Sequence, residues 1–311
     1  MPRKAEIRVA PTATDALLDD LARLDGLFEL RLQRGVVVVP RADLVTVVLQ
    51  NRALQDLMRI LDRHRLGEEG GVSVVTSEPD SVVETGDPAR VDRDSNEGSW
   101  EEMEAIISKD SNAGPNTLLL IVAAGVLTAV GIAMNEIHIA IGGMLVAPAF
   151  MPIMRISLGL VAGSAVWRRG VVDTLKLYLV LAASAAACAL AMRGAGLDPL
   201  DAGAGYYAVA KPFFQYWTTT NWSGVSTSAA AALAGALLIV TKRSTFTSGV
   251  MIGLALVPSA SLVGMELVAG NPEASARAAL RWLTDVALVL AVSAAVFAWE
   301  RRRLHRRDMR M

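Results

Sequence analysis

The sequence is poor in the residues that usually build metal sites and disulfides. It contains one cysteine, Cys188, and three histidines in 311 residues. A single cysteine excludes an intrachain disulfide and a cysteine-cluster metal site. No HExxH helix, glycine-rich phosphate loop or paired nucleophile and base is visible either. We therefore expect a protein that is not an enzyme and that holds no cofactor and no metal.

Excess charge of one sign is also missing, because the formal net charge is only -1. Residues 78–110 are acidic and residues 301–307 are basic, whereas the N-terminal part shows no basic face. Nucleic acid is therefore not an expected partner. The start of the chain is charged and has no short apolar stretch with a cleavage site, so we expect the first spanning helix to direct membrane insertion.

The first eighty residues alternate between strand and helix patterns and predict a soluble domain over residues 1–80. The order is βαββαβ, which is typical of a small α+β ferredoxin-like domain with two helices on one face of an antiparallel sheet. Such a domain serves in ligand sensing, in oligomerisation or as scaffold, so the fold alone assigns no role. The expected elements are 6–9, 14–24, 28–32, 44–49, 54–66 and 72–75.

Two connecting segments follow this domain. Residues 81–99 are rich in Glu, Asp, Gly and Ser and predict an acidic flexible linker. Residues 100–110 regain helical periodicity, with Trp100, Met103 and Ile107 on one side. This pattern predicts an amphipathic helix that lies on the membrane surface or packs under the membrane domain.

Long apolar runs from residue 111 to residue 300 predict a transmembrane domain, followed by a basic tail over 301–311. We expect a mainly α-helical polytopic fold of about six spans. The second span is too long for a straight helix, so it must be tilted, bent or broken. The predicted spans are 117–134, 137–166, 171–192, 225–241, 246–269 and 282–299.

Positive charges between the spans predict the orientation. Arg168, Arg169, Lys242, Arg243 and the tail arginines fall on one side of the membrane. The positive-inside rule then places both termini in the cytoplasm of a multi-pass protein of the cell (inner) membrane. Three spans precede the loop over 193–224 and three follow it, so the two halves form inverted repeats.

Two similar proline motifs mark the second and fifth spans. Residues 141–148 read IGGMLVAP and residues 251–258 read MIGLALVP. A proline removes a backbone donor, and half-helix ends near the midplane can bind ions or polar solutes. The alternative is a pair of kinks that serve packing alone. The candidate solute-binding residues in these motifs are Gly142, Gly143, Pro148, Pro152, Gly253 and Pro258.

Further polar residues lie near the same motifs. Arg155 follows Pro152 and would lie deep in the membrane on a continuous helix, which favours an anionic or phosphate-bearing solute. Alternatively the helix ends near Met154, and Arg155 pairs with Asp173 in a cytoplasmic vestibule. The candidate hydroxyl and amide ligands are Asn221, Ser226, Ser259 and Ser261.

Alanine-rich stretches in the third and fourth spans, 182–189 and 229–236, place small residues four apart. Small residues allow helices to approach closely, within the chain or between subunits. We expect a homo-oligomer, a dimer or a trimer, with membrane lipids as further partners.

These motifs, in this order, resemble a known family. The predicted head, then IGGMLVAP with Pro152, then residues 249–258 (GVMIGLALVP), resemble the domain of unknown function 389 family of prokaryotic hydrophobic membrane proteins. Members commonly carry a second proline after the later motif, where this chain has Ser259. The resemblance implies a membrane protein and supplies no reaction.

The sequence thus predicts a transporter or channel-like carrier that binds a small polar solute, of the anionic or phosphate-bearing class, between two proline-broken helices. The alternative is a membrane-anchored sensor or assembly protein whose N-terminal domain binds a ligand or partner.

Overall fold

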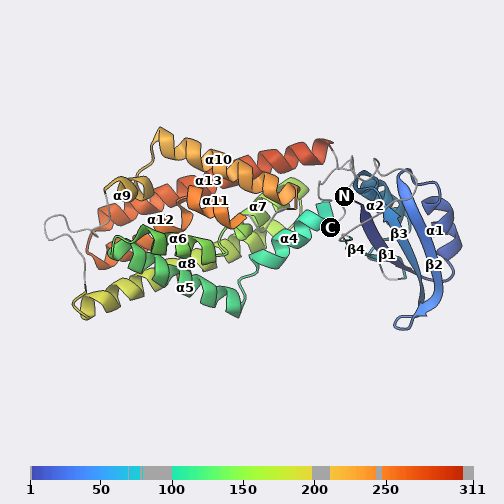
Figure 1. Ribbon diagram of the computed structural model, residues 1–311, viewed down its shortest axis with the longest axis horizontal. Coiled ribbons are helices and arrows are strands. Elements are labelled where there is room, and N and C mark those ends of the chain that lie inside the picture. The colour runs from blue at the N-terminus through green and yellow to red at the C-terminus, as the bar shows by residue number, and fades with distance from the viewer. Residues whose placement is uncertain are drawn as a thin grey trace. The chain divides into compact units, whose positions relative to one another are not determined.

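The computed structural model describes residues 2–68, 70–77, 79, 100–197, 211–242 and 247–303 (Figure 1). Most of these residues fall into two compact units, an N-terminal head and a helical unit that begins at Trp100. The predicted linker, 81–99, lies outside the described residues, as do positions 304–311 of the tail.

The head is built around a four-stranded antiparallel sheet, as predicted. The strands lie side by side in the order β2-β3-β1-β4, and all three neighbouring pairs are antiparallel. A short 3₁₀ turn, Asn51–Ala53, precedes the second helix. The elements are β1 (Arg3–Val9), α1 (Thr14–Leu21), β2 (Leu27–Val37), β3 (Ala42–Leu49), α2 (Leu54–Arg63) and β4 (Ser73–Ser77).

Alternating apolar side chains of the sheet and one stripe of each helix form the core of the head. In β1 the buried positions are Arg3, Ala5, Ile7 and Val9, the last three of them apolar, because successive side chains of a strand point to opposite faces. In α2 the spacing of Leu54, Leu57 and Leu61 puts their side chains on one face, and all three are buried. The sheet and the helices therefore share one apolar cluster.

A buried carboxylate, Asp43, stabilises the base of the β2–β3 hairpin. It accepts a hydrogen bond of 2.7 Å from the Thr14 hydroxyl and one of 2.8 Å from the backbone N–H of Gly35. Because both bonds favour the ionised form, Thr14 first and Gly35 second, the pKa of Asp43 lies below its usual value.

This carboxylate predicts a pH dependence for the head. A depressed folded pKa contributes stability above the unfolded value, about 3.9, and that contribution is lost as the pH falls through the folded pKa. We expect Asp43→Asn to weaken the head at pH 7 and to converge with the wild type in acid. Hydrogen exchange of head peptides in the full chain, corrected for intrinsic rates, measures this. The exposed Asp19→Asn is the control; equal losses at pH 7 would contradict the prediction.

The helical unit consists of packed helices (Figure 1). Its apolar side chains form a second, separate core cluster. The helices are α4 (Trp100–Ser111), α5 (Pro115–Ala133), α6 (Ile137–Val146), α7 (Met151–Ala162), α8 (Val166–Gly194), α9 (Lys211–Thr218), α10 (Trp222–Val240), α11 (Thr247–Gly253), α12 (Leu256–Val268) and α13 (Pro272–Arg303).

Among the described residues, four helices are long and apolar enough to cross a membrane: α5, α8, α10 and α13. The bent pair α6 and α7, at 43°, makes a fifth span if it counts as one, and α12 is a shorter apolar helix. A multi-pass membrane fold is therefore supported, whereas a count of six spans stays a prediction.

The helix that carries the last predicted span begins ten residues before that span. The span is expected over 282–299, and α13 begins at Pro272. The Asn271 side chain accepts a hydrogen bond of 3.1 Å from the N–H of Ala274, so it caps the helix N-terminus. Because the first turns of α13 carry charged residues, an apolar window does not include them. Asp285 lies in the interior of α13.

The helix α4 packs into the helical unit. Trp100, Met103 and Ile107 are buried in its core, and the Trp100 ring meets Phe297 of α13 edge-on, with centroids 6.5 Å apart. Lys242, just after α10, forms an ion pair of 2.6 Å with Glu102. The apolar side of α4 therefore packs into the core of the helical unit.

Candidate functional site

Two helix breaks lie at the centre of the helical unit. The first separates α6 from α7 over residues 147–150, and the second separates α11 from α12 over residues 254–255. Pro148 lies in the first gap, whereas Pro152 and Pro258 lie in the first turns of α7 and α12. The N–H groups of a first turn have no partner within the helix, so a proline there costs no hydrogen bond.

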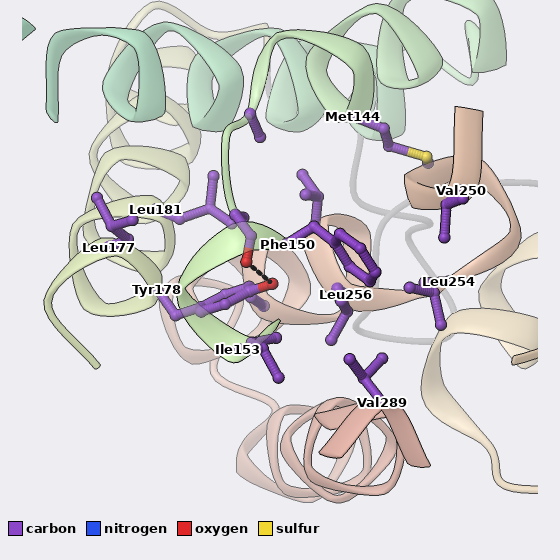
Figure 2. Close-up of a cluster of buried hydrophobic side chains, with 14 of the residues drawn as sticks. Met144, Phe150, Ile153, Leu177, Tyr178, Leu181, Val250, Leu254, Leu256 and Val289 are labelled. Carbon is purple, nitrogen blue, oxygen red and sulfur yellow. Dashed lines mark hydrogen bonds between the residues drawn. The ribbon is translucent and has the colours of Figure 1, made fainter. Parts of the chain in front are cut away.

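The two breaks pack against each other through apolar side chains. Figure 2 shows Phe150 from the first break beside Leu254 and Leu256 from the second. On α10, a Cβ built on Gly235 would lie 2.4 Å from the Phe150 ring and 3.2 Å from Val250. Because Gly235 has no side chain, Phe150 from the first half of the chain and Val250 from the second half can both pack against it.

Side chains from neighbouring helices satisfy the backbone groups that the breaks set free. The Tyr178 hydroxyl, on α8, donates to the Ala149 carbonyl at 3.2 Å (Figure 2). The Tyr216 hydroxyl, on α9, donates to the Gly253 carbonyl at 2.9 Å. Asp285, on α13, accepts from the N–H of Ala255 at 2.8 Å. These bonds matter because an unpaired backbone group in hydrocarbon costs several kcal/mol.

A fully buried ion pair lies at the second break. Arg281 Nη1 and Asp285 Oδ1, one turn apart on α13, are 2.7 Å apart, and both side chains are 0% exposed. The guanidinium also donates to the Ser228 hydroxyl at 3.0 Å and to the Tyr216 carbonyl at 3.2 Å. One carboxylate thus joins a buried cation to the backbone N–H of Ala255, the residue just before α12.

Contacts between α8 and α13 connect this pair to the first break. The rings of Tyr178 and Trp282 meet edge-on with centroids 5.0 Å apart. Tyr178 therefore touches both the first break, through its hydroxyl, and the helix that carries Arg281 and Asp285. The groups that meet here are a cation, a carboxylate, and neutral hydroxyl and carbonyl oxygens, which are groups that can bind a polar solute.

The predicted glycines differ in their surroundings. A Cβ on Gly143 would lie 2.3 Å from Thr128 Oγ1 on α5, so this glycine serves close helix packing. A Cβ on Gly142 would meet nothing within 4 Å. Gly253 ends α11 and faces the methyl group of Ala231 on α10. Of the three, Gly253 belongs to a break.

The predicted polar residues fall into two groups. Ser259 and Ser261 are buried on α12; Ser259 donates to the Trp217 carbonyl at 2.7 Å, whereas the Ser261 hydroxyl has no hydrogen-bond partner in the described part of the chain. Asn221 caps α10 by accepting from Gly224 N–H at 2.7 Å. Ser226 is exposed and bonds to its own helix. Only the α12 serines lie in the interior beside a break.

Arg155 lies apart from the second break. Its Nη1 donates to Ser111 Oγ at 3.0 Å and to Asn112 Oδ1 at 3.1 Å, and it lies 3.7 Å from Asp173 Oδ2. Ser111 and Asn112 directly precede α5, so Arg155 is level with the beginning of that helix. The structure therefore matches the pairing with Asp173 that the sequence left open, with Arg155 buried inside α7 rather than following its end.

Sequence reasoning missed the residues that hold the breaks together. Tyr178, Tyr216, Arg281 and Asp285 were not predicted as site residues. One signal could have found the pair: Asn271-Pro272-Glu273 is a typical helix start, and beginning the helix there puts Arg281 and Asp285 in its interior, four residues apart. The tyrosines carry no such signal.

Comparisons with known proteins agree with the predicted resemblance. Residues 144–291, which include most of the first motif, all of the second and the Arg281–Asp285 pair, match the family described as Domain of unknown function (DUF389), and this confirms the resemblance. An uncharacterized protein of Methanocaldococcus jannaschii is 23% identical over 201 residues, which cover 64% of this chain and 58% of that protein. No solved structure matches the chain.

Proposed function

We propose that the DUF389 region forms a transporter or channel-like carrier for a small polar solute, bound where the two helix breaks meet. The observation that carries this proposal is the Arg281–Asp285 pair, 0% exposed, inside a helix long and apolar enough to cross a membrane. Ionisable groups at such depth are costly, and they usually mark solute or ion pathways. Discontinuous helices at the same place are a recurring feature of carrier binding sites.

Within this proposal, the solute is anionic or phosphate-bearing. Arg281 gives two of its contacts to neutral oxygen atoms, those of Ser228 and Tyr216. A guanidinium has five donors in a planar fork that fits carboxylate and phosphate oxygens. An anion can therefore replace the neutral acceptors while Asp285 keeps the cation in position. Ser261, buried on α12 with its hydroxyl unbonded, supplies a further donor near the second break.

Inverted repeats are part of the same proposal. The first half (α5, α6 with α7, α8) and the second half (α10, α11 with α12, α13) each break their second element. In each half the third helix also supplies a partner for the break, Tyr178 or Asp285. These features support two three-span halves of opposite topology. The proposal further places both termini in the cytoplasm of the cell membrane, from the positive charges between the spans, and includes assembly as a dimer or trimer through the small residues of α8 and α10. The strand order β2-β3-β1-β4 supports a ferredoxin-like head.

Solute flux tests the proposal. The purified full chain is reconstituted in liposomes and assayed for gradient-driven uptake of phosphate, sulfate and small carboxylates. We expect uptake of at least one anion above protein-free liposomes, and at least about a tenfold loss in Arg281→Lys, because an ammonium lacks the planar fork. Arg277→Lys, on the exposed side of the same helix, is the matched control. No uptake of any anion, or equal uptake by Arg281→Lys and wild type, would overturn the site.

A further inference from the structure

The β2–β3 hairpin of the head ends in an exposed apolar tip. Residues 36–39 are four consecutive valines, followed by Pro40. Val36, Val38 and Val39 are 50%, 77% and 86% exposed. Single exposed apolar residues are normal on a soluble domain, but adjacent ones at the end of a protruding hairpin usually indicate a contact surface.

Cations flank this tip. Arg34 and Arg41 stand on either side of the valines, and no acidic residue occurs from position 34 to position 42. Arg34 pairs with Asp15 at 2.8 Å, and both side chains are exposed, whereas Arg41 is exposed with no ion pair in the described part of the head. Exposed apolar side chains flanked by arginines are typical of a segment that binds an anionic lipid surface.

The base of the hairpin holds the tip in a defined conformation. Asp43 accepts hydrogen bonds from the Gly35 N–H and the Thr14 hydroxyl, and Val37 pairs with Ala42 across the hairpin. The valines are therefore presented by an ordered strand pair rather than by a loose loop, which lowers the entropy cost of docking.

We propose that this valine tip, residues 36–41, inserts into the anionic lipid surface of the membrane that the helical unit spans. The chain itself argues for this occupant, because a segment of about twenty residues joins the head to α4. A tether of this length gives the head an effective concentration at the membrane in the millimolar range. At that concentration, a weak apolar contact and a few charges are sufficient for membrane binding. The proposal rests on the membrane domain and not on transport, so it stands or fails independently of the proposed solute site.

Site-specific fluorescence in the full chain tests the insertion. In a Cys188→Ser background, Val38→Cys is labelled with an environment-sensitive dye and reconstituted in nanodiscs that contain nitroxide lipids. We expect several-fold stronger quenching with phosphatidylglycerol than with phosphatidylcholine alone. Glu68→Cys, in the exposed turn after α2, is the matched control and should show little quenching in either membrane.

A double variant tests the role of the arginines. Arg34→Gln with Arg41→Gln should reduce the preference for anionic lipid, and an unchanged preference would overturn that role.

Two further results would overturn the insertion of the tip. The first is equal quenching at positions 38 and 68. The second is efficient disulfide crosslinking of unlabelled Val38→Cys between two copies without lipid quenching, because the tip would then be a subunit contact. Val38 is exposed, so loss of folding does not account for these outcomes.

Discussion

Replacing Arg281 with methionine should lower the free energy of unfolding of the helical unit by about 3–5 kcal/mol, the usual cost of leaving one member of a buried ion pair alone. Asp285 would keep its bond to the Ala255 N–H but lose the cation 2.7 Å away. Ser228 and the Tyr216 carbonyl would lose their donor as well. Unfolding in mixed detergent micelles, followed by tryptophan fluorescence, measures the change.

The same helix supplies the control for this experiment. Arg277 and Glu273 form an ion pair with the same four-residue spacing, but their side chains are 48% and 81% exposed. Arg277→Met should therefore change stability by no more than about 0.5 kcal/mol. The double change Arg281→Met with Asp285→Leu should recover much of the loss, since a buried pair can often be replaced by apolar residues. Equal effects at positions 277 and 281 would show that the buried pair does not hold the second break.

Adding one methyl group at Gly143 should destabilise the helical unit by about 1–3 kcal/mol, the range expected for overpacking. The new Cβ would lie 2.3 Å from Thr128 Oγ1 and 2.8 Å from the backbone oxygen of Ala124. The Thr128 side chain can rotate, but the backbone of α5 cannot move without separating α5 from α6. Thermal unfolding in detergent measures the shift for Gly143→Ala.

The neighbouring glycine is a matched control on the same helix. A Cβ at Gly142 would meet nothing within 4 Å, so Gly142→Ala should be neutral or stabilise α6 by up to about 1 kcal/mol through helix propensity. The two variants have the same composition and differ only in which face receives the methyl group. A loss of stability in Gly142→Ala as large as in Gly143→Ala would mean that contact with α5 does not determine the effect at position 143.

The breaks were predictable because they depend on local chemistry. Proline removes a donor and glycine loosens the helix wherever they occur, so the motifs around Pro148 and Pro258 locate the interruptions from sequence. What holds the breaks depends on tertiary contact. Tyr178 reaches Ala149 from another helix, and its sequence surroundings resemble any apolar span.

The two charged sites show a limit of local sequence patterns. The apolar window begins at position 282, whereas α13 begins at Pro272, so the window does not show that Arg281 and Asp285 share one helix. For Arg155 the sequence left two positions open. Its distance from the rim was counted along a continuous helix, whereas its partners Ser111 and Asn112 lie at the entry of α5. Depth in a bundle with broken helices depends on which segments pack side by side, and that information is not local.

The burial of α4 has a consequence for biosynthesis. This helix leaves the ribosome before all the helices that cover it, and its Trp100 contacts Phe297, close to the end of α13. The Trp100 end of its apolar stripe therefore stays uncovered until translation of the chain is nearly complete. Only when the last helix is made can the Trp100 ring be enclosed against Phe297, so the packing of the first helix of the unit is completed by the last one.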